Sequence, residues 1–230
     1  MKSKRVIQYH LEYILFLLPM CALFVLISLI PFLEGFRLSL MDWNGVSSSS
    51  NFVGLRNYIE IFQDKKFGQA CLFSLKFVVC SVVAVNLLGL ALALALNSKL
   101  KTRNALRTTF FLPQLIGGLV TGYIWQFIFV YVLPEVAEKL NLPFLNINWF
   151  VSPSYAFLSL VIVFVWQYSG YLMIIYIAAL QGVPPELLEA AQIDGAGYLQ
   201  RLRHVILPLI RNSITICIFL LISTAFKMYD

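Results

Sequence analysis

The chain is organised around long apolar runs, of which residues 155–180 are the clearest: YAFLSLVIVFVWQYSGYLMIIYIAAL. A helix of this length, at about 1.5 Å per residue, exceeds the roughly 30 Å hydrocarbon core of a bilayer. Similar uncharged runs cover 13–32, 77–96 and 109–133. A fifth, 209–226, has Arg211 and Asn212 near its start, so its uncharged part is close to the lower limit for crossing. The sequence predicts an all-α integral membrane protein with five transmembrane helices.

The composition supports this class, since 60% of the residues are hydrophobic and only 12% are charged. Polar residues are too few to cover one soluble core. The four cysteines lie in or beside apolar runs without metal-ligand spacing, so we expect neither a disulfide framework nor a metal site. No His, Asp or Glu lies inside the four clearest runs, which disfavours a membrane-embedded enzyme and a proton-coupled carrier.

The net charge of +6 is sorted along the chain rather than gathered in one block. Basic residues concentrate at the N-terminus and in every second connection: Lys2, Lys4, Arg5, Lys99, Lys101, Arg103, Arg107, Arg201, Arg203 and Arg211. Positively charged loops face the cytoplasm in membrane proteins. The pattern therefore predicts a cytoplasmic N-terminus and a cytoplasmic segment between the fourth and fifth runs, and it argues against nucleic-acid binding.

That cytoplasmic segment, at about 184–208, is polar and bent. Pro184-Pro185 ends the fourth helix and favours a new helix from Glu186 to Ile193, and Gly195 permits a sharp turn. A second amphipathic helix follows and ends at Pro208; its apolar stripe consists of Leu199, Leu202 and Ile206. We expect a helix-turn-helix elbow at the membrane surface. These residues alone leave a docking element and a plain connector equally open.

Several motifs resemble one family of transport proteins. Glu189-Ala190-Ala191, then Gly195, then Val205 and Leu207-Pro208 are similar to the EAA loop of permease subunits of binding-protein-dependent ATP-binding-cassette importers, which usually have isoleucine at the position of Val205. Motifs elsewhere resemble the carbohydrate-importing branch, whose substrates include disaccharides, oligosaccharides and glycerol phosphates; they are residues 41–44 (MDWN), 52–58 (FVGLRNY), 111–113 (FLP), Trp125 and 147–149 (INW).

The resemblance implies a bacterial or archaeal cell-membrane permease that imports a sugar. It implies as partners a second permease, two ATPase subunits that hold ATP and Mg²⁺, and an extracytoplasmic solute-binding protein. This chain would have no cofactor, no catalytic residue and no enzymatic activity. The residues expected to couple to the ATPase are Glu189, Ala190, Ala191, Asp194, Gly195, Leu207 and Pro208. Family members usually have six helices, so we expect a chain truncated before a final helix.

The division of the chain follows from the same resemblance. Residues 1–70 are predicted to form an N-terminal anchor helix and an external loop, and 71–230 the permease core. The external loop contains an amphipathic stretch with aromatic residues, which favours either a lid or a short helix at the membrane surface.

The polar residues within the spans are the candidate substrate path: Gln167, Tyr168 and Tyr171 in the fourth run, and Thr224 in the fifth. Hydroxyl, amide and aromatic groups suit sugars, but hydrogen bonding between helices explains such residues equally well. Asn86 and Gln126 raise the same question. Pro113 predicts a kink in the third helix, and the pairs Gly89/Ala93 and Gly118/Gly122 predict close helix packing. An amino-acid or peptide importer and a non-transporting scaffold or sensor remain alternatives.

Overall fold

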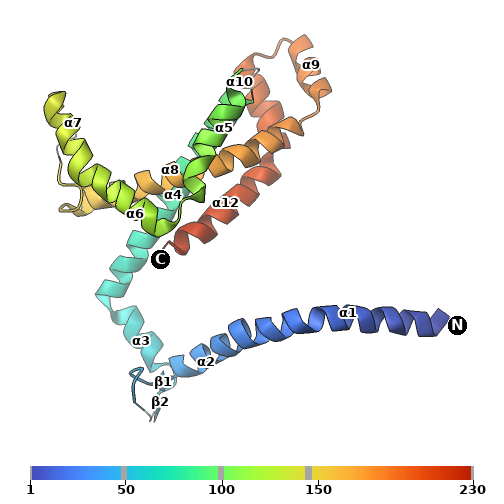
Figure 1. Cartoon of the computed structure of the whole chain (residues 1–230), viewed down its shortest axis with the longest axis vertical. Helices are drawn as coiled ribbons and strands as arrows, with labels where there is room; N and C mark the ends of the chain where they lie inside the picture. The colour runs from blue at the N-terminus through green and yellow to red at the C-terminus, as the bar shows by residue number, and fades with distance from the viewer. Residues whose placement is uncertain (1, 48–50, 98–100, 143–146, 229–230) are drawn as a thin grey trace. The chain divides into compact units, whose positions relative to one another are not determined.

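The computed structural model describes residues 2–47, 51–97, 101–142 and 147–228, and their side chains from residue 13 onward. Lys99, one of the basic residues used for the topology, lies outside these ranges. The chain forms two compact units, residues 1–71 and 72–230, with helix α4 running through the boundary (Figure 1). Whether the two units act as separate domains stays a prediction.

The first unit begins with one continuous helix. It consists of α1 (Lys2–Phe24), the π-helical turn η1 (Val25–Leu29) and α2 (Ile30–Ser39). The predicted end at residue 32 was too early, because the candidate span covers Tyr13–Ser39. A short antiparallel hairpin follows, in which β1 (Met41–Asp42) pairs with β2 (Asn51–Phe52). Helix α3 (Arg56–Gln63) then leads directly to α4.

The second and third predicted spans differ in outcome. Helix α4 (Lys65–Leu96) is a single uninterrupted span. The predicted third helix, 109–133, was wrong in its start: Thr109 belongs to α5 (Arg103–Phe111), and the spanning helix begins at Gly118. Between them lie the 3₁₀ turn η2 (Leu112–Leu115) and extended backbone at Ile116 and Gly117. Pro113 has no N–H to donate, and the extended backbone at Ile116 and Gly117 after it makes a break in the helix rather than a kink.

The spanning part of this region runs on through three helical pieces. They are α6 (Gly118–Phe127), the π-helical turn η3 (Ile128–Val132) and α7 (Leu133–Lys139). The fourth predicted span is confirmed as α8 (Pro153–Gln181).

The last part of the chain is bent. Helix α9 (Pro185–Ile193) matches the predicted first arm of the elbow. The second arm comprises α10 (Tyr198–Arg201), η5 (Leu202–Ile206) and α11 (Leu207–Leu209), so it continues past Pro208, where we expected its end. It meets α12 (Arg211–Phe226) at 69°. Within the described residues four helices qualify as spans, and a fifth only if this bent pair is counted as one.

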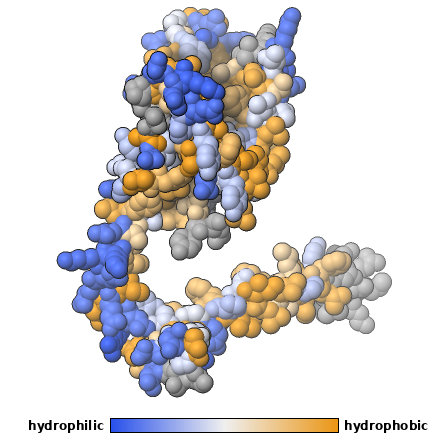
Figure 2. Space-filling model, turned by 60° about the vertical axis from the view of Figure 1, so that its left-hand side comes forward, coloured by the Kyte–Doolittle hydropathy of each residue, from blue (hydrophilic) through white to orange (hydrophobic). Residues whose placement is uncertain are grey.

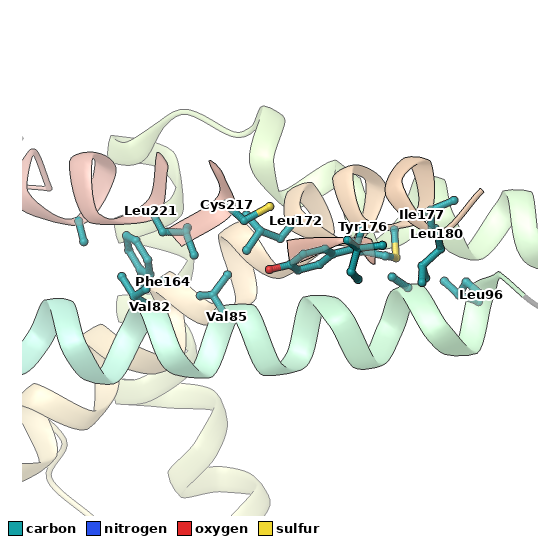
Figure 3. Packing of buried hydrophobic residues seen from close by; sticks show 14 of the residues in the cluster. Val82, Val85, Leu96, Phe164, Leu172, Tyr176, Ile177, Leu180, Cys217 and Leu221 are labelled. Carbon is teal, nitrogen blue, oxygen red and sulfur yellow. The ribbon is translucent and has the colours of Figure 1, made fainter. Parts of the chain in front are cut away.

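The core of the second unit is formed by α4, α8 and α12. Figure 3 shows apolar side chains of α8 and α12 directed toward α4, among them Phe164, Leu172 and Leu221. The close packing predicted for Gly89 is confirmed, because a Cβ there would lie 2.9 Å from Leu172 Cβ. No described atom lies within 4 Å of a Cβ at Gly118 or Gly122, so this pair does not pack closely against the described part of the chain.

One hydrogen bond crosses this core between α8 and α4. The hydroxyl of Tyr176, which is 1% exposed, donates to Asn86 Oδ1 at 2.5 Å, and Asn86 Nδ2 donates to the Val82 carbonyl at 2.7 Å. Of the two roles left open for Asn86, the structure shows interhelical bonding. A polar pair in an apolar core fixes the register of the two helices, because a shift would leave both groups without partners.

The outer surface of the helices is apolar. Figure 2 shows hydrophobic residues along the helix of the first unit and on the sides of the second. None of the apolar window of Tyr13–Ser39 is buried within the chain. A water-soluble protein does not expose continuous surfaces of this kind, whereas lipid-facing helices do. The structure therefore agrees with the class of membrane protein that the composition predicted.

Candidate functional site

The elbow between α8 and α12 is built on a defined turn. Gly195 has φ = +79°, which glycine adopts without steric cost. The N–H of Ala196 donates to the Ala191 carbonyl at 2.9 Å, and the N–H of Gly195 donates to the Gln192 carbonyl at 3.1 Å. This pair of bonds is the Schellman arrangement that ends a helix in the left-handed conformation. The sharp turn predicted at Gly195 is confirmed.

Further contacts hold the two arms of the elbow together and to the bundle. Arg201 Nη1 donates to Gln192 Oε1 at 3.2 Å, and this bond joins α10 to α9. On the inner side Leu188, Ile206 and Leu207 pack against the helix core. The elbow is thus a small body fixed to the ends of α8 and α12, rather than a loose loop.

The outer side of the elbow is open and partly apolar. Ile193 is 86% exposed, Leu199 73% and Tyr198 61%. The stripe expected on the second helix is therefore divided: Leu202 and Ile206 are half-buried, but Leu199 points outward. Sequence reasoning missed this exposed trio, although three large apolar residues beside a glycine turn in a polar connection between two spans are a usable signal.

A hollow of about 380 Å³ lies in the angle between α9 and η5. Its lining residues are Ala191, Asp194, Gly195, Ala196, Gln200, His204 and Val205. Of the predicted coupling residues, Ala191, Asp194 and Gly195 thus meet at one place. Glu189 and Ala190 are exposed on α9; in the last part of the second arm, Leu207 is half-buried and Pro208 is exposed.

The second candidate site is an open pocket of about 840 Å³. It is bounded by α6, the first half of α8 and the end of α12. Three of the four predicted path residues, Gln167, Tyr168 and Thr224, line it. Tyr171 does not; it packs against the core one turn further along α8, where α5 covers the helix at Gly170. A Cβ at Gly170 would overlap the Phe110 carbonyl, a contact that sequence reasoning missed.

Two polar groups in the pocket have no hydrogen-bond partner within the described chain. They are the hydroxyl of Thr121, which is 2% exposed, and the indole N–H of Trp125. Gln167 Nε2 donates to the Ile116 carbonyl at 3.3 Å, so the break before α6 is tied to α8, while Thr224 Oγ1 donates to the Leu220 carbonyl. An unpaired buried polar group costs free energy, and a polar solute or water can recover it.

Aromatic rings form one wall of this pocket. The Trp125 ring lies 5.2 Å from Phe129 and 5.5 Å from Trp166, measured between ring centres. Gln126 also lines the pocket, and Lys227 is the charged residue among its lining residues. Thr121 and Lys227 could not be singled out from sequence, because threonine is common in such helices and a lysine at a helix end usually reaches for the headgroups.

The apolar spans, the elbow between two of them and the open pocket bounded by three helices fit a membrane-spanning component of a transport system. Residues 86–230 match the family described as binding-protein-dependent transport system inner membrane component. The chain belongs to this family, which is one of permeases of ATP-binding-cassette importers. It is accordingly a component of a transport system.

Known relatives agree with this assignment. The chain is 40% identical over 218 residues to the probable starch degradation products transport system permease protein AmyD of Thermoanaerobacterium thermosulfurigenes, covering 95% of this chain and 74% of the relative. It is 31% identical to the multiple sugar-binding transport system permease protein MsmF of Streptococcus mutans, covering 94% and 74%. The fold is that of a chain in the crystal structure of a bacterial ABC transporter for alginate import, with TM-score 0.82, 20% identity and coverage of 99% and 79%.

Proposed function

We propose that the chain forms half of the path by which a sugar, delivered by an external binding protein, crosses the cell membrane. The observation that carries this proposal is the open pocket at α6, α8 and α12 with its unpaired polar groups. Its volume of about 840 Å³ lies within the range of small-molecule sites, roughly 300–1,000 Å³. The sugar-related names of the relatives AmyD and MsmF support the same substrate class.

The chemistry of the pocket suits a carbohydrate. Trp125 and Tyr168 offer aromatic surface to the C–H faces of a sugar ring. The Thr121 hydroxyl, the Trp125 N–H and the Gln167 amide offer donors and acceptors to its hydroxyl groups. An apolar group placed against them would leave them unpaired, at a cost of about 1–3 kcal/mol each. The names of the relatives, rather than this cost, favour a sugar over an amino acid.

The elbow is proposed to dock on a separate ATPase subunit, which binds ATP and Mg²⁺. The exposed carboxylate of Glu189 is available for a basic residue of that subunit, and Ala190 beside it permits a close approach. The exposed side chains of Ile193, Tyr198 and Leu199 supply apolar area for the same interface. A second permease and a second ATPase complete the proposed complex, with the N-terminus of this chain in the cytoplasm.

Helix α8 connects the two sites mechanically. It carries Gln167 and Tyr168 at the pocket and ends at Gln181, where the elbow begins. Helix α5 packs closely against α8 at Gly170, and the hydrogen bond of Tyr176 joins α4 to α8. A displacement of the elbow is therefore transmitted to the pocket by a packed group of helices rather than absorbed by a loop.

The test is uptake of labelled solutes by the reconstituted complex with its binding protein. Trp125→Phe keeps an aromatic ring but removes the unpaired N–H, and loss of one neutral hydrogen bond of about 0.5–1.5 kcal/mol raises the KM for the sugar roughly 2- to 10-fold. Tyr131→Phe is the matched control, because Tyr131 is 64% exposed and outside the pocket. Uptake of amino acids or peptides but not sugars would refute the proposed substrate, and purification of the complex without any ATPase would refute the proposed docking of the elbow.

A further inference from the structure

Helix α3 in the first unit has one apolar side that is exposed in the described part of the chain. Leu55 at its start, Ile59 and Phe62 follow each other at helical spacing and are 65%, 57% and 82% exposed. Arg56, Glu60 and Gln63 lie on the neighbouring side, about 100° around the helix from this row. Such a division is typical of a helix that lies along an interface between water and an apolar phase.

The helix is held at the end of the first membrane span. Asn57 Nδ2 donates to the carbonyls of Ser39 and Met41, both at 2.9 Å, and the Tyr58 hydroxyl lies 2.6 Å from Ser39 Oγ. Ser39 is the last residue of α2. These contacts use the side of α3 that carries Asn57 and Tyr58, and they leave the row Leu55, Ile59, Phe62 free.

The other end of α3 is joined to a second span without a spacer. Asp64 alone separates it from α4, and the Phe62 ring lies edge-on to Phe67 of α4, 6.4 Å away between ring centres. The apolar row therefore continues to Phe67 of α4, which is itself 42% exposed. Since α2 and α4 both belong to spans, α3 is confined to the immediate neighbourhood of one bilayer surface.

We propose that α3 is a membrane-interface anchor whose occupant is bilayer lipid. The row Leu55, Ile59, Phe62 lies at the boundary of headgroups and acyl chains, and the polar side faces water. The Arg56–Glu60 ion pair at 2.7 Å leaves this side with little net charge to attract a protein partner. Lys65 and Lys66, at the start of α4, reach lipid phosphates.

The anchor has a structural consequence. Because α3 is fixed at one end to α2 and at the other to α4, embedding it in the interface sets the depth at which both spans cross. Burying apolar surface contributes about 25 cal/mol per Å². The three large side chains of the row therefore supply a substantial share of the free energy that holds α3 in the membrane interface. This role is independent of the transported solute and does not rest on the proposed function.

The test is site-directed spin labelling of the assembled transporter in vesicles of phosphatidylcholine with phosphatidylglycerol. Labels replace Ile59 and Phe62 on the apolar side, and Glu60 and Gln63 on the polar side, after substitution of the four native cysteines. We expect the ratio of collisions with oxygen to collisions with a water-soluble nickel chelate to be several-fold higher at 59 and 62 than at 60 and 63. Equal, high accessibility to nickel at all four positions would overturn the proposal.

Two further outcomes are decisive as well. If labels at 59 and 62 are shielded from both reagents, a protein surface covers the row, and lipid is excluded as the occupant. Phe62→Glu, with Gln63→Glu as its matched control, provides a second measurement with a label kept at 59. We expect only the change at Phe62 to raise the nickel accessibility of that label, because a carboxylate in the row lifts α3 out of the interface; no difference between the two variants would contradict the anchor.

Discussion

The contact between α5 and α8 at Gly170 is the most sensitive point of the bundle. In Gly170→Ala the added methyl would overlap the Phe110 carbonyl and lie within 2.9 Å of the Phe111 nitrogen. Both obstacles are backbone atoms, so no side chain can rotate away, and the two helices must separate. Forced packing of this kind costs typically about 1–3 kcal/mol, and sometimes more.

The substitution also has a favourable component. Alanine is better than glycine within a helix by about 0.5–1 kcal/mol. Taking the upper part of the packing range, the net loss is about 2 kcal/mol, which lowers the melting temperature of a chain of this size by roughly 4–8 °C. Since α5 covers α8 beside the pocket, we also expect weaker uptake.

The measurement is thermal unfolding of the purified subunit in detergent, followed by uptake in the reconstituted complex. Gly122→Ala is the control for stability: it is also a helical glycine, and nothing lies within 4 Å of its Cβ position. We expect its melting temperature to be unchanged or raised. Equal melting temperatures for Gly170→Ala and the unsubstituted chain would show that α5 and α8 do not pack as closely as described.

Three other predictions concern the core, the end of α4 and the elbow. Tyr176→Phe leaves Asn86 Oδ1 without its donor and should destabilise the subunit by about 1–3 kcal/mol in thermal unfolding, an effect that Asn86→Leu in the same chain should reduce. Arg107→Gln removes a 2.8 Å hydrogen bond from a cation to the last carbonyl of α4 and should cost about 1.5–3 kcal/mol; an unchanged melting temperature would contradict this. Gly195→Ala places a side chain at φ = +79°, at a cost of about 1–2 kcal/mol, and should lower solute-stimulated ATP hydrolysis of the complex, whereas Gly197→Ala, at φ = −68°, should not.

The elbow shows how far local sequence signals reach. Proline before α9, glycine after it and the EAA-like pattern are read from neighbours in the chain, and the observed turn has the expected glycine in the left-handed conformation. The break at Pro113 is a case in which the right residue was recognised but its effect was underestimated. The consecutive extended residues Ile116 and Gly117 turn a kink into a new helix start.

The sequence by itself determined the membrane class, four of the spans in outline and the position of the elbow, because these depend on the length of apolar runs and on local backbone preferences. Only the tertiary structure decided which polar residues meet. It separates Tyr171 from Tyr168, brings Thr121 and Trp125 to the same pocket, and pairs Asn86 with Tyr176. The reason is that the sequence of an apolar span is hydrophobic on all sides of the helix and so does not show which side faces which neighbour. Packing between helices that are distant in the chain decides this.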